Sequence, residues 1–407
     1  MFSILNSGLL QRSFLMRLLQ ITGLSVALMT TSAAGVHAED VTVQGADGAN
    51  GEDGVNPGDD GQSGGGGGAA VANAGGIDPI TSTLNTATAL GGGGGKGGDL
   101  FANGGFAGFG GPGGAATATA ATTILSGLSE ADATSTGGSG GSSGFARVEN
   151  PAFFANGGQG GAATASATAS TGGGNVTASA LATGGNGGVG DGVGGGGGDA
   201  SANSTARTTG SGDALSSANA TGGEAGHGFD IPGVGGSATA MADASAAGGG
   251  KAIATAVATT PVIVEAFPPI NANNATSNAV TVNGAMAQAL STVVGPSFGP
   301  AGQATSTAKT RLAGVAVQSS ATAASVDNGL SPSDTATTEA IAQGRSGQTL
   351  DFADLPETFA VSTALPDKAY ATTLIEAFGA SNVADALLGP GVELRQRRPN
   401  FHRGFRR

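Results

Sequence analysis

Few residues of this chain are equipped for acid–base or nucleophilic chemistry. Cys is absent, which excludes thiolate nucleophiles, zinc–thiolate sites, iron–sulfur clusters and disulfides. His227 lies in a glycine-rich spacer and His402 in a basic tail, and neither neighbours a plausible nucleophile. The Asp and Glu residues show no spacing that singles out a catalytic pair. We therefore expect no catalytic residues and no cofactor, and predict that the chain is not an enzyme.

Two glycine-rich motifs have some features of ion-binding sites. Lys96 lies among glycines, but a phosphate-binding loop needs a Ser or Thr after the Lys and then a helix, and neither follows. The nonapeptide GGKGGDLFA (94–102) resembles the calcium-binding repeats of RTX proteins, which implies calcium held by turn carbonyls and Asp99 between tandem coils. A second copy, GGGGGDASA (194–202), has Ser201 where an apolar residue belongs. We assign no metal site and keep calcium as an alternative.

Composition limits the fold that could position any such residue. Gly contributes 78 of 407 residues, only 4% are aromatic and 11% are charged, and Trp is absent. The apolar residues are mostly Ala, which buries little surface per residue. A core packed with aromatic side chains is therefore excluded.

Charge is distributed unevenly along the chain. Residues 1–38 contain Arg12 and Arg17, an apolar run and the small-x-small sequence Val36-His37-Ala38, which predicts a signal peptide cleaved after Ala38. All 29 acidic residues fall within 39–394, so the body repels nucleic acid, and we expect no membrane span after cleavage. The Arg-rich segment 391–407 is predicted to be a disordered basic tail. Five early acids form either a weak calcium cluster or the solvated charges of a linker: Asp47, Glu52, Asp53, Asp59 and Asp60.

Self-comparison shows a repeat. Glycine turns begin at Gly172, Gly210 and Gly248, a period of about 38 residues across 162–261, and looser copies extend the repeat region to 69–325. On each side of a turn the residues alternate with period two, which is typical of strands. Val176, Ala178, Ala180 and Ala182 share one such face, and we expect the Ala faces to be interior.

The remaining segments are less regular. Aligned on the turns, Ala163 and Ala165 sit one position out of phase with Ala202 and Ala240, which predicts a weakly specified register. The spacers between repeats are either flexible loops or extended polyglycine-type helices packed side by side. Five Phe residues are expected to cover the Ala strands: Phe101, Phe106, Phe109, Phe153 and Phe154.

Three flanking segments complete the predicted organisation. Residues 39–68 are interpreted as an acidic, glycine-rich linker and 326–350 as a second linker. Residues 351–390 have helical spacing of Leu, Ile and Ala, with Ser381 as N-cap and Gly389 as stop, and are predicted to form a small helical segment.

The spacers of GGxGG type with Ala/Thr segments are similar to bacterial secreted glycine-rich repeat proteins, and loosely to the PGRS domains of mycobacterial PE family proteins. The resemblance implies an extracellular or cell-surface role without catalytic residues. We predict an all-β repeat, either an elongated Ala/Gly-cored β-solenoid or an array of stacked β-hairpins.

The predicted function is structural or adhesin-like, through self-association or contact with cell-surface or extracellular matrix components. One alternative is a solenoid that binds ice, polysaccharide or calcium, with Thr rows such as Thr164/Thr168 and Thr255/Thr259. Another is a largely disordered matrix component.

Overall fold

The computed structural model divides into two units, Met1–Ala34 and Gly35–Arg407. It describes residues 39–56, 58–75, 83–100, 105–145 and 155–260, followed by eight strands between 273 and 388. The predicted signal peptide and the basic tail lie outside the described residues. The interpretation of 326–350 as a linker is corrected, because Thr335–Arg345 form a strand that pairs on both sides, and the rest of that segment lies outside the described residues. All described residues belong to the second unit.

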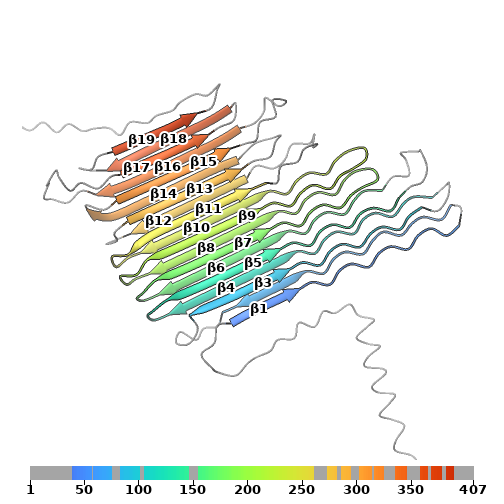
Figure 1. Ribbon diagram of the computed structural model, residues 1–407, viewed down its shortest axis with the longest axis horizontal. Helices are drawn as coiled ribbons and strands as arrows, with labels where there is room; N and C mark the ends of the chain where they lie inside the picture. Colours follow the sequence, from blue (N-terminus) through green and yellow to red (C-terminus); the bar gives the residue numbers. More distant parts are fainter. Residues whose placement is uncertain are drawn as a thin grey trace, which may run out of the picture. The chain divides into compact units, whose positions relative to one another are not determined.

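The strands form two sheets that alternate along the chain (Figure 1). One sheet holds β1 (Glu39–Gln44), β3 (Leu84–Leu90), β5 (Ser129–Thr136), β7 (Val176–Thr183), β9 (Ala214–Thr221), β11 (Lys251–Thr259), β13 (Met286–Val294), β15 (Ala316–Ala324), β17 (Thr358–Ala364) and β19 (Asn382–Leu388). The other holds β2 (Ala70–Ala74), β4 (Ala116–Ile124), β6 (Ala163–Thr171), β8 (Ala200–Thr208), β10 (Ala238–Ala246), β12 (Asn273–Thr281), β14 (Gly302–Ala313), β16 (Thr335–Arg345) and β18 (Lys368–Ala377).

Each strand pairs in parallel with the strand two places along, and the strand between them belongs to the opposite sheet. The described part of the chain is therefore all β and solenoid-like, with open sheets and no helix. Parallel pairing rules out the alternative of stacked hairpins, in which consecutive strands would pair antiparallel. We call one odd strand, the chain that follows it and the next even strand a coil.

The core between the sheets is built from methyl groups. In β6 and β7, as in their neighbours, buried and more exposed residues alternate, and the buried ones are almost all Ala. Ser hydroxyls in the same layer bond to one another across it, as Ser277 of β12 and Ser291 of β13 do at 2.8 Å. The expectation that the Ala faces are interior is confirmed.

The register of the first strands differs from the prediction. Ala163 pairs with Ala200 and Ala165 with Ala202, so Ala lies on Ala throughout this ladder. Four residues, 172–175, join β6 to β7, whereas five, 209–213, join β8 to β9. The extra residue is accommodated in the turn. An alignment on the turns therefore displaces the strands by one position, although the strands themselves pair in register. Burial of the Ala face holds the register, because a slip of one residue would expose it.

The glycine-rich spacers are ordered arms, extending from the strands of the first five coils (Figure 1). An outgoing arm follows each odd strand, at 45–54, 91–99, 137–145, 184–190 and 222–228. A returning arm precedes each even strand, at 59–69, 105–115, 155–162, 193–199 and 231–237. The outgoing arms form one layer and the returning arms a second.

Hydrogen bonds between the arms repeat every third residue. Gly45, Gly48 and Gly51 donate their N–H groups at 2.7–2.8 Å to carbonyls of the next coil, the first at the end of β3 and the other two in the outgoing arm. Other glycines bond across the layers, as when the N–H of Gly95 donates to the Gly65 carbonyl at 2.8 Å. A three-residue period is that of a polyglycine-type helix. Of the two alternatives for the spacers, the structure shows packed polyglycine-type helices.

Two expectations are corrected by these arms. Residues 39–68, interpreted as a linker, form β1 and both arms of the first coil, because their glycines bond to the next coil. Phe106 and Phe109 lie at outward positions of a returning arm, each 52% exposed, and do not cover the Ala strands. The three-residue period explains this, since these side chains occupy the only position that faces no other arm. Phe101, Phe153 and Phe154 lie outside the described residues.

The helices predicted over 351–390 are wrong. β17, β18 and β19 lie in this region and continue the parallel ladders. Segments such as Lys368–Ala377 combine Ala with Thr, Ile and Tyr, so their spacing fits both periods, and pairing with the preceding strands decides between them. Ser381 and Gly389 lie outside the described residues.

A pair of adjacent glycines tests whether arm packing depends on the missing side chain. A Cβ at Gly195 would overlap the Gly158 carbonyl oxygen, whereas one at Gly196 would lie 3.4 Å from the Val234 oxygen, an ordinary contact. We expect Gly195→Ala to lower the free energy of unfolding by about 1–3 kcal/mol. Gly196→Ala should be neutral or stabilising by about 0.4–1 kcal/mol. Urea denaturation followed by circular dichroism measures both, and equal losses would contradict the packing described here.

Candidate interaction surfaces

In the described arms, every third residue points away from both layers, outside the main-chain hydrogen bonds that join the arms. Side chains from the preceding coil accept the N–H groups of several of these residues. The Gly93 N–H donates to Asp47 Oδ1 at 2.8 Å, and the Lys96 N–H donates to Asn50 Oδ1 at 2.9 Å. The same arrangement holds at Asp53, Asp60, Asn156, Asn186 and Asp199. The Asp and Asn residues of the arms thus form side-chain caps between coils.

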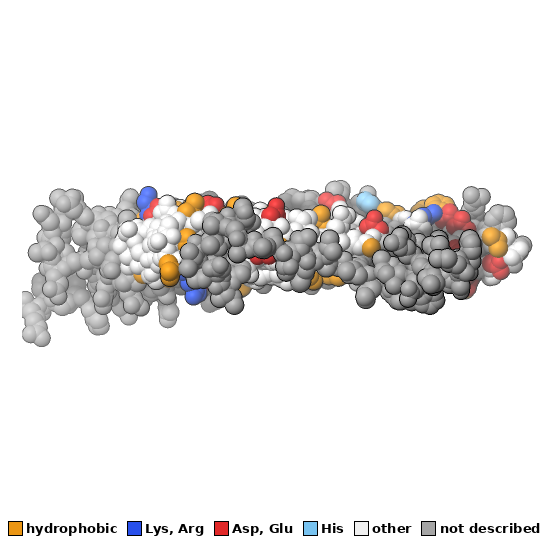
Figure 2. Space-filling view, turned by 90° about the horizontal axis from the view of Figure 1, so that it is seen from below, with side chains coloured by type: hydrophobic (Ala, Val, Ile, Leu, Met, Phe, Trp, Pro, Cys, Tyr) orange, Lys and Arg blue, Asp and Glu red, His pale blue; other side chains and the backbone are white. Residues whose placement is uncertain are grey.

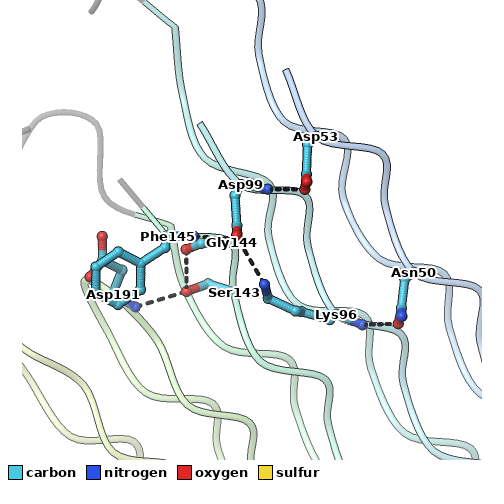
Figure 3. Close-up of polar contacts among 8 residues, drawn as sticks. All are labelled: Asn50, Asp53, Lys96, Asp99, Ser143, Gly144, Phe145 and Asp191. Atoms are coloured by element: carbon cyan, nitrogen blue, oxygen red, sulfur yellow. Dashed lines mark hydrogen bonds and ion pairs between the residues drawn. The ribbon is translucent and has the colours of Figure 1, made fainter. Parts of the chain in front are cut away.

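The calcium-type nonapeptide lies within this pattern (Figure 3). Asp99 Oδ1 accepts a hydrogen bond from the Phe145 N–H at 3.0 Å and pairs with Lys96 Nζ at 2.7 Å. The Asp99 N–H in turn donates to Asp53 Oδ1 at 2.7 Å, and the Ser143 hydroxyl oxygen accepts the Asp191 N–H at 2.9 Å. Within the nonapeptide, the Asp99 carboxylate and main-chain N–H are therefore both engaged with neighbouring coils, at Phe145 and Asp53.

The five early acids do not converge on one point. Asp47, Asp53 and Asp60 each cap a different N–H one coil away, and Asp59 accepts from Asn56. Within the described residues, no group of three or more His, Cys, Asp or Glu side chains is placed to hold a metal ion. His227 is exposed on an outgoing arm, and His402 lies outside the described part of the chain.

The outer faces of the sheets carry rows of hydroxyl groups. One row on the even-numbered sheet runs through Thr117, Thr164, Ser201 and Thr239, which are register partners in successive strands. The odd-numbered sheet has a row of four Thr residues at its strand ends: Thr136, Thr183, Thr221 and Thr259. The proposed pairs Thr164/Thr168 and Thr255/Thr259 therefore lie on different sheets.

Other residues interrupt these rows. Leu181 and Leu215, each 39% exposed, stand on the outer face of the odd-numbered sheet together with Asn219. On the same face burial raises the pKa of the Asp132 carboxyl above its usual value. The even-numbered sheet presents the more continuous hydroxyl surface, and its exposed apolar interruptions are Val71, the register partner of Thr117, and Met241.

The first coil forms an open edge. β1 and β2 stand at the ends of their sheets and pair on one side only, with β3 and β4. Figure 2 looks onto the molecule from below, and acidic side chains gather at the right-hand end of that view. Residues 39–95 contain no Lys, Arg or His, so this edge is acidic throughout.

Apolar side chains are concentrated where the arms reverse direction. Val55, Phe145, Val189 and Phe229 lie at or near the ends of four outgoing arms and are all more than half exposed. This row offers a second surface for contact, distinct from the hydroxyl faces.

Comparisons with known proteins identify no family. No family model matches the chain, and no curated protein matches it. Among solved structures, the nine polyproline type II helical bundle springtail antifreeze protein from Granisotoma rainieri is 20% identical, with 47% of this chain and 96% of that chain covered and a TM-score of 0.09. A likeness of that size supports no argument about this chain. In the described residues, no helix is long and apolar enough to cross a membrane.

Sequence reasoning missed the side-chain caps. Their signal was available, because Asp199 and Ser237 are one repeat apart, as are Asn175, Asp213 and Lys251, whose N–H groups and side-chain oxygens bond in series. An Asp or Asn placed one repeat before a residue that faces outward marks such a cap.

Removing one cap should loosen a single amide. Asp199 Oδ1 accepts both the N–H and the hydroxyl of Ser237 at 2.8 Å. We expect Asp199→Ala to speed hydrogen exchange of the Ser237 amide about tenfold, equal to about 1.4 kcal/mol, because no main-chain acceptor replaces the carboxylate. Asp199→Asn, which retains an oxygen, should have a much smaller effect.

Exchange measured by NMR contains its own control. The Gly236 N–H donates to the Gly223 carbonyl and should be unaffected by either substitution. Faster exchange at both amides would mean that the whole coil has loosened and that the cap has no local role.

Proposed function

We propose that this protein is a secreted or surface-exposed structural protein, adhesin-like in character, that acts by self-association and surface contact. The observation that carries the proposal is the open parallel stack, in which flat outer faces repeat once per coil and the first strands keep an unpaired edge. Unpaired edges of parallel sheets are ready templates for further strands. Stacked repeats of this kind commonly serve as extended binding surfaces.

An extracellular location is supported by the predicted leader. Cleavage after Ala38 would make Glu39 the first residue, and Glu39 is also the first residue of β1. The acidic body is suited to remaining soluble until it meets a surface or another copy. The partners we propose are further copies of the chain and components of the cell surface or extracellular matrix.

The proposal predicts both location and assembly. Expressed with its leader in a secreting bacterium, the chain should be recovered outside the cytoplasm with Glu39 at its N-terminus. Sedimentation velocity of that material should show species whose size grows with concentration. Retention in the cytoplasm, or a monomer that also fails to adhere to cell-wall preparations, would contradict the proposed function.

A second candidate is recognition of an ordered surface such as ice or a polysaccharide. The observation that favours it is the hydroxyl row on the even-numbered sheet, whose members are about 4.8 Å apart from strand to strand. A flat lattice of hydroxyl groups can match repeating oxygen positions on such a surface.

Two matched substitutions on opposite faces test this candidate. Thr164→Tyr places a large ring in the hydroxyl row, whereas Thr177→Tyr places the same ring on the outer face of β7. If the chain binds ice, thermal hysteresis should be present in the unmodified chain, be lost in Thr164→Tyr and persist in Thr177→Tyr. For a polysaccharide, pull-down on the insoluble polymer should follow the same order. Absence of both activities in the unmodified chain would rule this candidate out.

A further inference from the structure

We infer that copies of this chain join end to end, with β19 of one copy pairing with β1 of the next and its Arg-rich segment lying along the acidic first arm. The inference rests on the proposed function and names the partner for its self-association. It concerns one surface, the open edge of the first coil, and one occupant, a second copy of the chain.

The main-chain hydrogen-bonding groups of successive β1 residues point alternately into the stack and toward its open side. The Glu39 N–H bonds to Asn85 Oδ1 at 3.1 Å and the Gly45 N–H to the Leu90 carbonyl at 2.8 Å, so odd-numbered residues direct their N–H groups into the stack. Directions alternate along a strand, so Asp40, Thr42 and Gln44 turn their main-chain groups toward the open side. This edge is therefore ready to accept one more parallel strand.

The first outgoing arm, like β1, forms main-chain hydrogen bonds with the second coil on one side and has an open side opposite. Gly45, Gly48, Gly51 and Gly54 donate to the carbonyls of Leu90, Gly93, Lys96 and Asp99. The matching carbonyls of the first coil belong to Gln44, Asp47, Asn50 and Asp53, and no described main-chain N–H donates to them. The outer side of the arm is thus a line of acceptors.

The topology determines which strand fits. Every described pairing is parallel, and the two sheets finish at β19 and β18. A neighbour that continues the odd-numbered ladder supplies β19 to β1, which joins the tail end of one copy to the head end of another. The even-numbered sheet ends one strand earlier, at β18, so one strand position stays open between β18 and the neighbour's β2. Such a contact is heterologous and does not close on itself, so repetition gives a filament.

Charge favours this pairing over two heads meeting. Residues 39–95 carry acids such as Glu39, Asp40 and Asp47 with no basic residue, so two first coils repel each other. Arg395, Arg397, Arg398, Arg403, Arg406 and Arg407 follow β19 in the sequence. Because odd strands are parallel, the chain leaves β19 toward the end at which a neighbour's first arm begins, beside Asp47 and Asp53. Arg pairs well with carboxylates there.

One substitution blocks the edge without disturbing the fold behind it. Thr42→Pro removes an N–H that points outward, a position at which edge strands tolerate Pro, and Thr42→Val keeps that N–H as the matched control. At the other end, all six arginines of 395–407 are changed to Gln. Its control changes Arg207 and Lys251, both exposed on the body, to Gln.

Sedimentation velocity and electron microscopy of the full chain, produced with its leader, give the readout. The unmodified chain should form linear assemblies that shorten as salt is raised. Thr42→Pro and the tail variant should each weaken association at least tenfold, while both controls assemble normally. Circular dichroism establishes that each variant retains its strands.

Mixing the two defective variants is the decisive experiment. The Thr42→Pro copy retains its tail and the tail variant retains its edge, so the mixture should form one-to-one dimers and nothing longer. Normal filaments from either variant alone, or no dimer in the mixture, would overturn the end-to-end inference. Filaments that either variant still forms alone would nevertheless support the proposed self-association, because they would show that copies assemble by another contact. A chain that stays monomeric but adheres to cell-wall preparations would overturn the inference alone, leaving surface contact as the function.

Discussion

Direct hydrogen bonding between main chains of neighbouring coils is the interaction on which the rest of this molecule depends. It links strand to strand in both sheets and glycine to glycine in the arms, where N–H groups meet carbonyls at distances such as 2.8 Å. Side chains must stay small for the chains to approach this closely. That requirement accounts for the methyl-lined core, and for glycine at positions such as Gly195, where a Cβ would overlap a neighbouring carbonyl.

Because main-chain contacts occupy the interior, the informative side chains are on the outside. Asp and Asn residues there complete hydrogen bonds that the main chain leaves open, so much of the acidity of the arms has a structural role. Thr and Ser fill the outer faces of the strands, and apolar residues such as Phe145 and Phe229 stand near the ends of the arms. Each class of surface therefore has its own place in the coil.

The strand stack could be predicted from the sequence because its signal is local. Ala178, Ala180 and Ala182 alternate with residues of the outer face, and an even period returns each of them to the same face. The order of the arms could not be settled in this way, since a glycine run has the same composition whether it is packed or loose, and its partners lie one coil away. The side-chain caps were missed for a related reason. The partner of Asp199 is the main-chain N–H of Ser237, and every residue except Pro has such a group, so residue type does not reveal it. In 368–377, Leu374 and Ile375 suit a helix or a strand equally, and only pairing with β16 decides.

The methyl-lined core also affects how stability responds to temperature. Unfolding a domain usually raises the heat capacity by about 12–15 cal/mol/K per residue, mostly through exposure of apolar surface. Here Ala supplies nearly all the buried apolar groups, and much of the surface released on unfolding is polar backbone, which lowers the heat capacity. The stability curve is accordingly flatter than for a core of Leu and Phe, and the folded state loses less of its stability on cooling.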